Sequence, residues 1–406
     1  MAVVARLPRP DDFAPPPTAA DLRRWDEADA AALPKRIAAL RAHMAGEGVD
    51  ALLLTSHADA RYFTGMRFGP NDEPTAGSSG WTLVTADRLA ILVDSRYTVQ
   101  ARHEAPQAEA IDYGSDAGAA VGTWVARGGA RRLALDPHTI RHAVWERIAA
   151  TTPGVELLAA RGWGVQLRAT KEAAEIERIA AACAVADRAL AGLLPQILPG
   201  TTEAALAWSL ERAMREGGAE ALAFDVAALA GGNAALPHGN PGERALRAGE
   251  VILFDFGAQV AGYRSDMTRT LFLGEPSAED REIYLRVLRG QSAAIELLQG
   301  AISDHATALP SGRAADEAAR AAIGSVAGVY DHGLGHGIGL QTHESPSLSR
   351  GAATDPLPSP TVFSVEPGIY IEERIGVRIE DLVAVDLAAG RLERLTRFPS
   401  DPIVLG

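Results

Sequence analysis

The chain has 406 residues, of which 47% are hydrophobic, so it is long and apolar enough to form two domains with cores of their own. Its formal net charge of −13 and its pI of about 5.3 argue against nucleic acid or an anionic membrane surface as a partner. The single cysteine, Cys183, excludes an internal disulfide framework. We also expect neither a signal peptide nor a stretch of transmembrane length, and therefore predict a cytoplasmic protein.

The first part of the chain is predicted to contain a leader and an α/β domain. Residues 1–20 are rich in proline and should form a loose lead or an arm packed on a neighbour. From 21 to 165, helical and β-prone patterns alternate, which is typical of a compact α/β domain. Helices are predicted at 36–44, 97–104 and 139–150, and strands at 50–55, 81–85, 89–94 and 132–135.

The second part, residues 166–406, is predicted to place strands after pairs of helices. A boundary falls near 161–170. Helices are predicted at 171–193, at 202–216 with Thr201 or Thr202 as its cap, at 278–298 and at 313–323. Because strands follow each pair, we expect an α+β fold with internal pseudo-symmetry, although no repeat is visible residue by residue.

Five potential metal ligands lie in short glycine- and strand-rich segments of this second part: Asp255, Asp266, His336, Glu366 and Glu380. Four carboxylates and an imidazole are a set that suits two hard or borderline divalent cations. A predicted hairpin with its turn at 261–262 should make the two aspartates near cross-strand neighbours. Bare carboxylates there would repel each other, and a pair of cations bridged by one of them would remove the conflict.

The two glutamates each allow an ordinary structural explanation as well. Glu366 follows an apolar strand at 362–365 and could be a simple turn residue, since Pro367 ends that strand. Strand alternation puts Glu380 on the same face as Arg378, so Glu380 could bridge two cations or merely pair with the arginine. Taken together, the five residues make a hydrolytic metalloenzyme the leading interpretation.

Histidines are unevenly distributed, because three of the ten fall between positions 332 and 343. Glycines alternate through the same segment, which argues against a helix and suggests backbone running close to a substrate or a metal. His238, after the Gly-rich run at 230–239, is a weaker candidate. The chain lacks HExxH, GxGxxG and GxSxG patterns, which excludes a zincin site, a dinucleotide site and a nucleophile elbow.

These segments resemble the metal-site motifs of the prolidase and Xaa-Pro aminopeptidase family, the pita-bread metallopeptidases. The motifs stand here as F254DFGAQVAGYRSDMTRT270, H332GLGHGIGLQTHESP346, S364VEPGIY370 and G376VRIED381. The resemblance covers roughly residues 167–385. It implies an α/β creatinase/prolidase-like N-terminal domain at 21–165, followed by an α+β pita-bread catalytic domain at 166–406.

The resemblance also implies a role for each site residue. Asp255 and Asp266 would be ligands, Asp266 serving both metals, while His336 and Glu366 would complete one metal's shell and Glu380 would bridge. The substrate-side histidines would be His238, His332 and His343, and the arginine and tyrosine behind the ligands would be Arg378 and Tyr370. Mn²⁺ is the usual metal of the family, although the ligand types also suit Co²⁺, Zn²⁺ or Fe²⁺.

In the implied mechanism, two cations activate a shared water that attacks the scissile carbonyl. His343 and His332 would donate hydrogen bonds to the developing gem-diolate. Glu366 would move the proton to the leaving imino nitrogen.

The implied substrates are peptides with an Xaa-Pro N-terminus. Segments G77SSGWTLVT85 and D94SRY97 look more like the aminopeptidase P side of the family, so we predict a Xaa-Pro aminopeptidase, with a Xaa-Pro dipeptidase as the alternative. A methionine-aminopeptidase-like enzyme would use the same ligands, but the extra N-terminal domain favours the proline-directed branch. A creatinase-like metal-free hydrolase or a non-catalytic interaction protein could lose the ligands. The resemblance also implies a homodimer.

Overall fold

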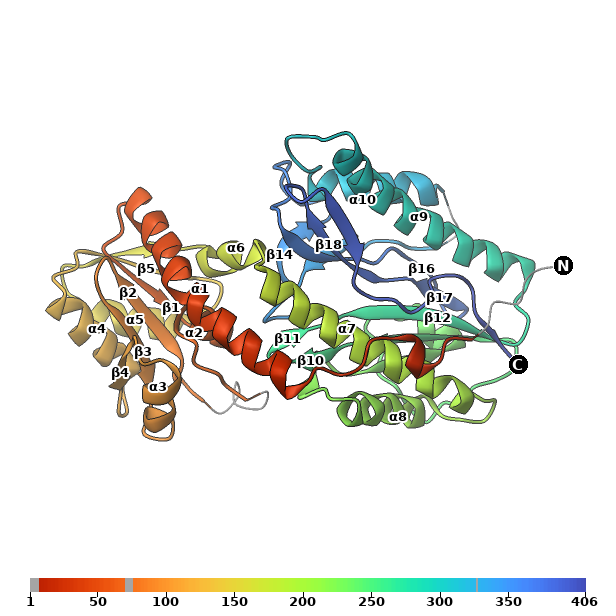
Figure 1. Ribbon diagram of the computed structural model, residues 1–406, viewed down its shortest axis with the longest axis horizontal. Helices are drawn as coiled ribbons and strands as arrows, with labels where there is room; N and C mark the ends of the chain where they lie inside the picture. Colours follow the sequence, from red (N-terminus) through yellow and green to blue (C-terminus); the bar gives the residue numbers. More distant parts are fainter. Residues whose placement is uncertain (1–6, 70–75, 326–327) are drawn as a thin grey trace. The chain divides into compact units, whose positions relative to one another are not determined.

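The computed structural model describes residues 7–69, 76–325 and 328–406. The chain divides into two compact units (Figure 1). Residues 23–168 form one, here called the N-terminal unit; residues up to Leu22 together with 169–406 form the other, here called the C-terminal unit. The first six residues of the predicted leader lie outside the described residues.

The N-terminal unit is built on a six-stranded mixed sheet of order β4-β3-β2-β1-β5-β6. Its strands are β1 (Ala51–Leu54), β2 (Trp81–Thr85), β3 (Leu89–Val93), β4 (Glu109–Asp112), β5 (Arg132–Leu135) and β6 (Glu156–Ala159). The helices of this part of the chain are α1 (Ala19–Gly46), α2 (His57–Thr64), α3 (Thr98–Glu104), α4 (Ala117–Arg127), α5 (His142–Thr151) and α6 (Trp163–Ala169). The predicted α/β domain is therefore confirmed.

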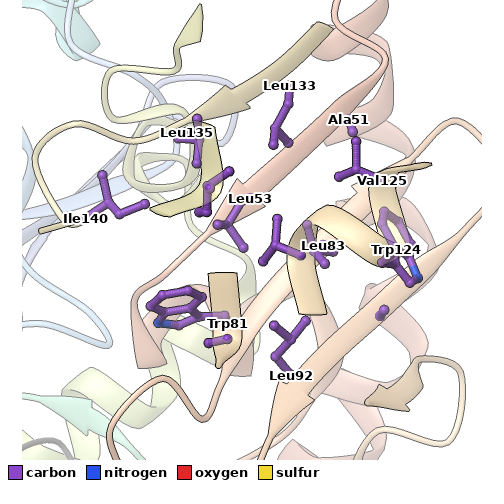
Figure 2. Close-up of a cluster of buried hydrophobic side chains, with 14 residues drawn as sticks. Ala51, Leu53, Trp81, Leu83, Leu92, Trp124, Val125, Leu133, Leu135 and Ile140 are labelled. Atoms are coloured by element: carbon purple, nitrogen blue, oxygen red, sulfur yellow. The ribbon is translucent and has the colours of Figure 1, made fainter. Parts of the chain in front are cut away.

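Alternation along the strands separates two cores in this unit. Leu83 of β2 and Leu92 of β3 share one face of the sheet, where Trp124 of α4 packs against them (Figure 2). Ile91 and Val93, which alternate with Leu92, belong to a second buried cluster. Because both faces bury apolar side chains, the strands read as nearly continuous hydrophobic runs.

The C-terminal unit repeats one pattern, in which a pair of helices is followed by strands. Helices α7 (Ala173–Leu193) and α8 (Glu203–Glu216) precede β7 (Ala221–Leu222), β8 (Ala227–Ala230), β9 (Val251–Phe256), β10 (Ala258–Val260), β11 (Tyr263–Arg264) and β12 (Met267–Leu273). Helices α9 (Ala278–Ser303) and α10 (Gly312–Ile323) precede β13 (Gly335–Gly337), β14 (Glu344–Leu348), β15 (Thr361–Val365), β16 (Gly368–Ile371), β17 (Ile375–Arg378), β18 (Asp381–Asp386), β19 (Arg391–Arg394) and β20 (Val404–Leu405).

The strands of this unit lie between the two helix pairs (Figure 1). The described residues form four sheets here, of order β11-β10-β7, β20-β12-β9-β8, β14-β13-β15-β18-β19 and β16-β17. Helix α8 begins where predicted, because the Thr202 side chain accepts a hydrogen bond from the backbone N–H of Ala205. The predicted order of helix pairs and strands is confirmed.

The described part of the leader packs on the C-terminal unit. Arg188 of α7 donates from Nη1 to the carbonyl oxygens of Pro10 at 2.8 Å and Phe13 at 3.3 Å. The ring of Phe13 stacks on Phe398, with centroids 6.2 Å apart. The sequence predicted a loose lead or an arm on a neighbour, but these residues are held by their own chain.

One helical segment of the described residues, Ala173–Gln196, is long and apolar enough to cross a membrane by length and composition. From the sequence, no such stretch was expected. In the structure 61% of its most apolar 18-residue window is buried inside the protein. Buried core helices meet the same criterion, so this segment is weak evidence of a membrane span.

Candidate metal centre

The two aspartates lie in the predicted hairpin but are not directly opposite each other. Asp255 in β9 pairs with Thr268 in β12, whereas Asp266 precedes β12. Asp255 is six positions before Ala261, the first turn residue, and Asp266 is only four after Gly262, so the aspartates are diagonal neighbours. They still share a face of the hairpin, because side chains alternate along each strand.

All five predicted ligands line one pocket of about 450 Å³ in the C-terminal unit. His336 lies in β13, and no helix forms around it, as the glycines predicted. Glu366 directly follows β15, and Glu380 lies between β17 and β18. The pocket is also lined by His238, His332, His343 and Arg378. Tyr370 lies behind this lining and contacts it through its hydroxyl.

The middle of the pocket could hold a metal ion. Asp266, His336 and Glu380 each offer a ligand atom, and these atoms lie within 4.8 Å of one another. Glu380 accepts a hydrogen bond at Oε2 from Thr268, but its Oε1 is buried and has no partner among the described residues. Burying an unpaired carboxylate oxygen is costly unless a cation faces it. The donor set therefore fits a divalent cation.

The charges of the pocket support the same interpretation. Burial raises the pKa of Asp266 and of Glu380 well above the usual range, and neighbouring carboxylates raise both further. Burial also raises the pKa of Asp255, although Arg378 opposes the shift. Glu366 differs, because His336 and Arg378 outweigh the effect of burial and hold its pKa below the usual range. The protein alone thus concentrates more carboxylates than it can keep ionised.

His336 presents one defined nitrogen to these carboxylates. Its Nδ1 lies 3.1 Å from the carbonyl oxygen of Gly337, and since a carbonyl only accepts, Nδ1 carries a proton. Nε2 therefore faces Glu366 at 3.3 Å and Asp266 at 3.7 Å. Burial lowers the pKa of His336, but Glu366 outweighs burial and raises it to about 9. The proton that this raised pKa retains is the one on Nε2, and a cation bound at Nε2 would take its place.

Arg378 ties three elements together behind the pocket. It donates from Nη2 to Asp255 at 2.5 Å, from Nη1 to the Tyr370 hydroxyl at 2.9 Å, and from Nε to the Thr268 hydroxyl at 2.9 Å. Its carboxylate partner is thus Asp255, so the alternative in which Glu380 merely pairs with Arg378 is not what the described residues show.

His332 has both ring nitrogens engaged. Nδ1 lies 2.7 Å from the Gly333 carbonyl oxygen, to which it must donate, and Nε2 lies 3.0 Å from the Tyr370 hydroxyl. Burial lowers the pKa of His332, so its neutral form accepts from Tyr370. No N–H of His332 is left for a substrate in this geometry, which differs from the predicted donor role.

His343 is placed differently. Its side chain is exposed at the pocket, with its ring centroid 4.2 Å from that of His336. Within the described ranges its ring nitrogens form no hydrogen bond. Partial burial lowers its pKa, and the charge of His336 lowers it further. A neutral imidazole with a free N–H therefore faces the pocket.

Several residues of the site were not singled out from the sequence. The pocket is also lined by Phe224, Pro237, Thr342, Ser347 and Ser349. Two buried hydroxyls contact predicted ligands directly: Thr268 donates to Glu380, and Ser364 donates to Glu366 at 3.0 Å. Thr268 lies two positions after Asp266, which precedes β12, and Ser364 lies two positions before Glu366, which follows β15. Period-two alternation was therefore a signal that could have identified both.

Comparison with known proteins shows which families the two parts of the chain match. Residues 177–386 match the model of "Metallopeptidase family M24", and residues 36–170 match that of the "Creatinase/Prolidase N-terminal domain". The uncharacterized peptidase YqhT of Bacillus subtilis is 32% identical over 361 residues, which cover 88% of this chain and 96% of the relative.

Solved structures of peptidases are similar to this chain over nearly its whole length. The Xaa-Pro dipeptidase from Bacillus anthracis has a TM-score of 0.82 and 31% identity, covering 92% of this chain and all of that one. The X-Pro aminopeptidase from Thermotoga maritima has a TM-score of 0.75 and 33% identity, covering 88% of this chain and 98% of that one. The predicted architecture, a creatinase-type N-terminal domain followed by a pita-bread domain, is confirmed. The chain belongs to metallopeptidase family M24.

Proposed function

We propose that this metallopeptidase is a Xaa-Pro aminopeptidase, which releases the N-terminal residue from peptides whose second residue is proline. The observation that carries the proposal is the convergence of four carboxylates and His336 on one pocket, where the buried Oε1 of Glu380 has no hydrogen-bond partner among the described residues. The Xaa-Pro substrates in the names of the similar solved structures support the substrate class.

The proposed metal ligands are Asp255, Asp266, His336, Glu366 and Glu380. Bound divalent cations would activate a water for attack and polarise the scissile carbonyl. Glu366, whose pKa is held low by His336, is ionised near neutral pH. It can accept the proton of the attacking water and pass it to the leaving imino nitrogen.

The remaining residues position these groups. His343, with its free N–H, would donate to the oxygen on which charge develops, and exposed His238 would contact the substrate beside it. The chain of donors Arg378, Tyr370 and His332 would hold the Asp255 carboxylate in one orientation rather than touch the reacting carbonyl.

For the cell, we propose Mn²⁺ as the metal, a homodimer as the assembly and the cytoplasm as the location. The oxygen-rich set with one imidazole supports Mn²⁺ but also accommodates Co²⁺, Zn²⁺ or Fe²⁺.

A Xaa-Pro dipeptidase is the second candidate, because the Bacillus anthracis dipeptidase is similar over its whole length. Metal-stripped protein should be assayed on Ala-Pro and on Ala-Pro-Ala, with Mn²⁺, Co²⁺ or Zn²⁺ added in turn. We expect metal-dependent release of alanine from the tripeptide. Hydrolysis of the dipeptide alone would make the chain a dipeptidase. Activity that survives thorough stripping would favour a creatinase-like hydrolase, and binding of a protein without turnover would favour an interaction protein.

A further inference from the structure

Thr268 lies with its hydroxyl between two groups of the proposed metal site, the Arg378 guanidinium and the Glu380 carboxylate. It is fully buried in β12, directly across the ladder from Asp255. Its Oγ1 lies 2.9 Å from Nε of Arg378 and 2.7 Å from Oε2 of Glu380. It therefore contacts both the Arg378 guanidinium, which donates to Asp255, and the Glu380 carboxylate.

The direction of both hydrogen bonds is determined by chemistry. An arginine nitrogen can only donate, so the Thr268 oxygen accepts from Arg378. The hydroxyl has one proton, and that proton must go to Oε2 of Glu380. Oε2 is thereby satisfied by the protein, while Oε1 is left buried without a partner among the described residues.

We infer that Thr268 is a positioning residue for metal binding, which engages one oxygen of Glu380 so that the other is presented to the cation. The inference rests on the proposed function, because it requires Glu380 to be a ligand. Hydrogen bonds to ligand carboxylates orient them, and loss of such a partner typically weakens metal binding ~10–100-fold.

The same strand supplies a matched control. Thr270 is also fully buried in β12 and lies two positions further along on the same face. Its hydroxyl donates to the carbonyl oxygen of Arg378 at 3.1 Å and accepts from the backbone N–H of Arg378 at 3.2 Å. In the part of the chain that the structure describes, it thus makes two hydrogen bonds to β17 and none to a carboxylate.

The test is to titrate the metal-stripped full chain with Mn²⁺. Binding is measured both by calorimetry and by the electron paramagnetic resonance signal of free Mn²⁺. Circular dichroism should first show that each variant is folded. We expect Thr268→Val to raise the Kd for Mn²⁺ ~10–100-fold, and Thr270→Val and Thr268→Ser to leave it within ~3-fold of wild type. The serine variant keeps the hydroxyl, so its rescue separates the hydrogen bond from packing.

Two results would overturn the inference. One is wild-type affinity in folded Thr268→Val, and the other is an equal loss in Thr270→Val, which would point to a general effect of disturbing β12. Should Thr268→Val not fold, Thr268→Ser and Thr268→Ala replace it, and equal affinities in those two would overturn the inference as well. If wild-type protein itself bound no Mn²⁺, the proposed metal site would fail first.

Discussion

His343 tests the proposed chemistry at the scale of one side chain. It is exposed at the pocket, and its ring contacts that of His336. We expect His343→Ala to lower kcat by ~10²–10³, because removing one donor to a developing oxyanion has an effect of that size. Mn²⁺ affinity should remain that of the wild type, since His343 is not among the proposed ligands.

The measurement is steady-state hydrolysis of an Xaa-Pro tripeptide at saturating Mn²⁺. His142→Ala, at an exposed position of the N-terminal unit, is the control and should not change kcat. A kcat near the wild-type value in His343→Ala would exclude the donor role.

The sequence predicted which residues meet in the pocket, because residue type, strand alternation and the resemblance to the family motifs together singled out the five proposed ligands. It did not predict how His332 is used. Its Nδ1 donates to the neighbouring Gly333 carbonyl, but its Nε2 is engaged only because the Tyr370 hydroxyl, from β16, lies beside it and is held in turn by Arg378 of β17. Rotamers and tautomers of this kind depend on neighbours distant in sequence.

Arg269 links three elements behind the metal site. It is fully buried, pairs with Asp381 of β18 at 2.6 Å, and donates to the carbonyl oxygens of Glu380 and Phe398. We expect Arg269→Met to lower the free energy of unfolding by about 3 kcal/mol, because breaking a buried pair leaves a carboxylate without its main partner. Arg394, 3.5 Å from the same carboxylate, keeps the loss at the lower end of the usual range.

Urea unfolding monitored by circular dichroism would measure this loss. Arg215→Met is the control, because the pair between Arg215 and Glu211 of α8 is half exposed and contributes little. Equal stability of the two variants would show that the Arg269 linkage does not hold these elements together.

Asp187 of α7 predicts a pH dependence. It is fully buried and accepts hydrogen bonds from the backbone N–H groups of Arg397 and Phe398. Burial raises its pKa to about 7, despite those two donors. Because the folded pKa lies above the unfolded one, the stabilisation is complete at low pH and is lost as pH rises through about 7.

The comparison that isolates this effect is wild type against Asp187→Asn, which does not titrate. The advantage of wild type in free energy of unfolding should shrink by roughly 2 kcal/mol between pH 5 and pH 8. Urea titrations of both proteins at the two pH values would measure it. A constant difference would mean that the Asp187 carboxylate is ionised throughout.

Among the elements, strong local signals were predicted well and context-dependent ends were not. Thr202 caps α8 as predicted, but α1 covers Ala19–Gly46 where only 36–44 was expected. Pro34 inside α1 is unfavourable for a helix, yet the helix continues through it. Helix α9 likewise passes Gly300 and ends at Ser303, and Ile302 in that last turn is buried. Tertiary burial outweighed local propensity in both cases.

The order of helix and strand patterns along the chain was sufficient to predict the two-domain architecture. Such patterns can be identified from hydrophobic periodicity and do not require knowledge of single contacts. The packing of the leader was not predictable in this way. It depends on Arg188 and Phe398, which lie far from residues 10–13 in the sequence. The apolar helix α7 shows the same limit, since only its burial distinguishes a core helix from a membrane span.

The two units should also respond differently to metal. Each contains its own hydrophobic cluster, and every residue that lines the pocket belongs to the C-terminal unit. A ligand that binds only the folded form stabilises it by about 2.7 kcal/mol at a free concentration of 100 times Kd. In calorimetry of metal-stripped protein, we therefore expect Mn²⁺ to raise the unfolding temperature of the C-terminal unit and a chelator to reverse the shift.

Assigning the transitions requires a variant that marks the other unit. Leu83→Ala removes a fully buried side chain from the N-terminal sheet. It should lower the free energy of unfolding of that unit by about 2–5 kcal/mol, and with it the unit's unfolding temperature, whether or not Mn²⁺ is present. Equal shifts of both transitions on adding Mn²⁺ would show that the units unfold as one. A shift confined to the transition that Leu83→Ala lowers would place the bound metal outside the pocket, because binding stabilises only the unit whose folded form holds it.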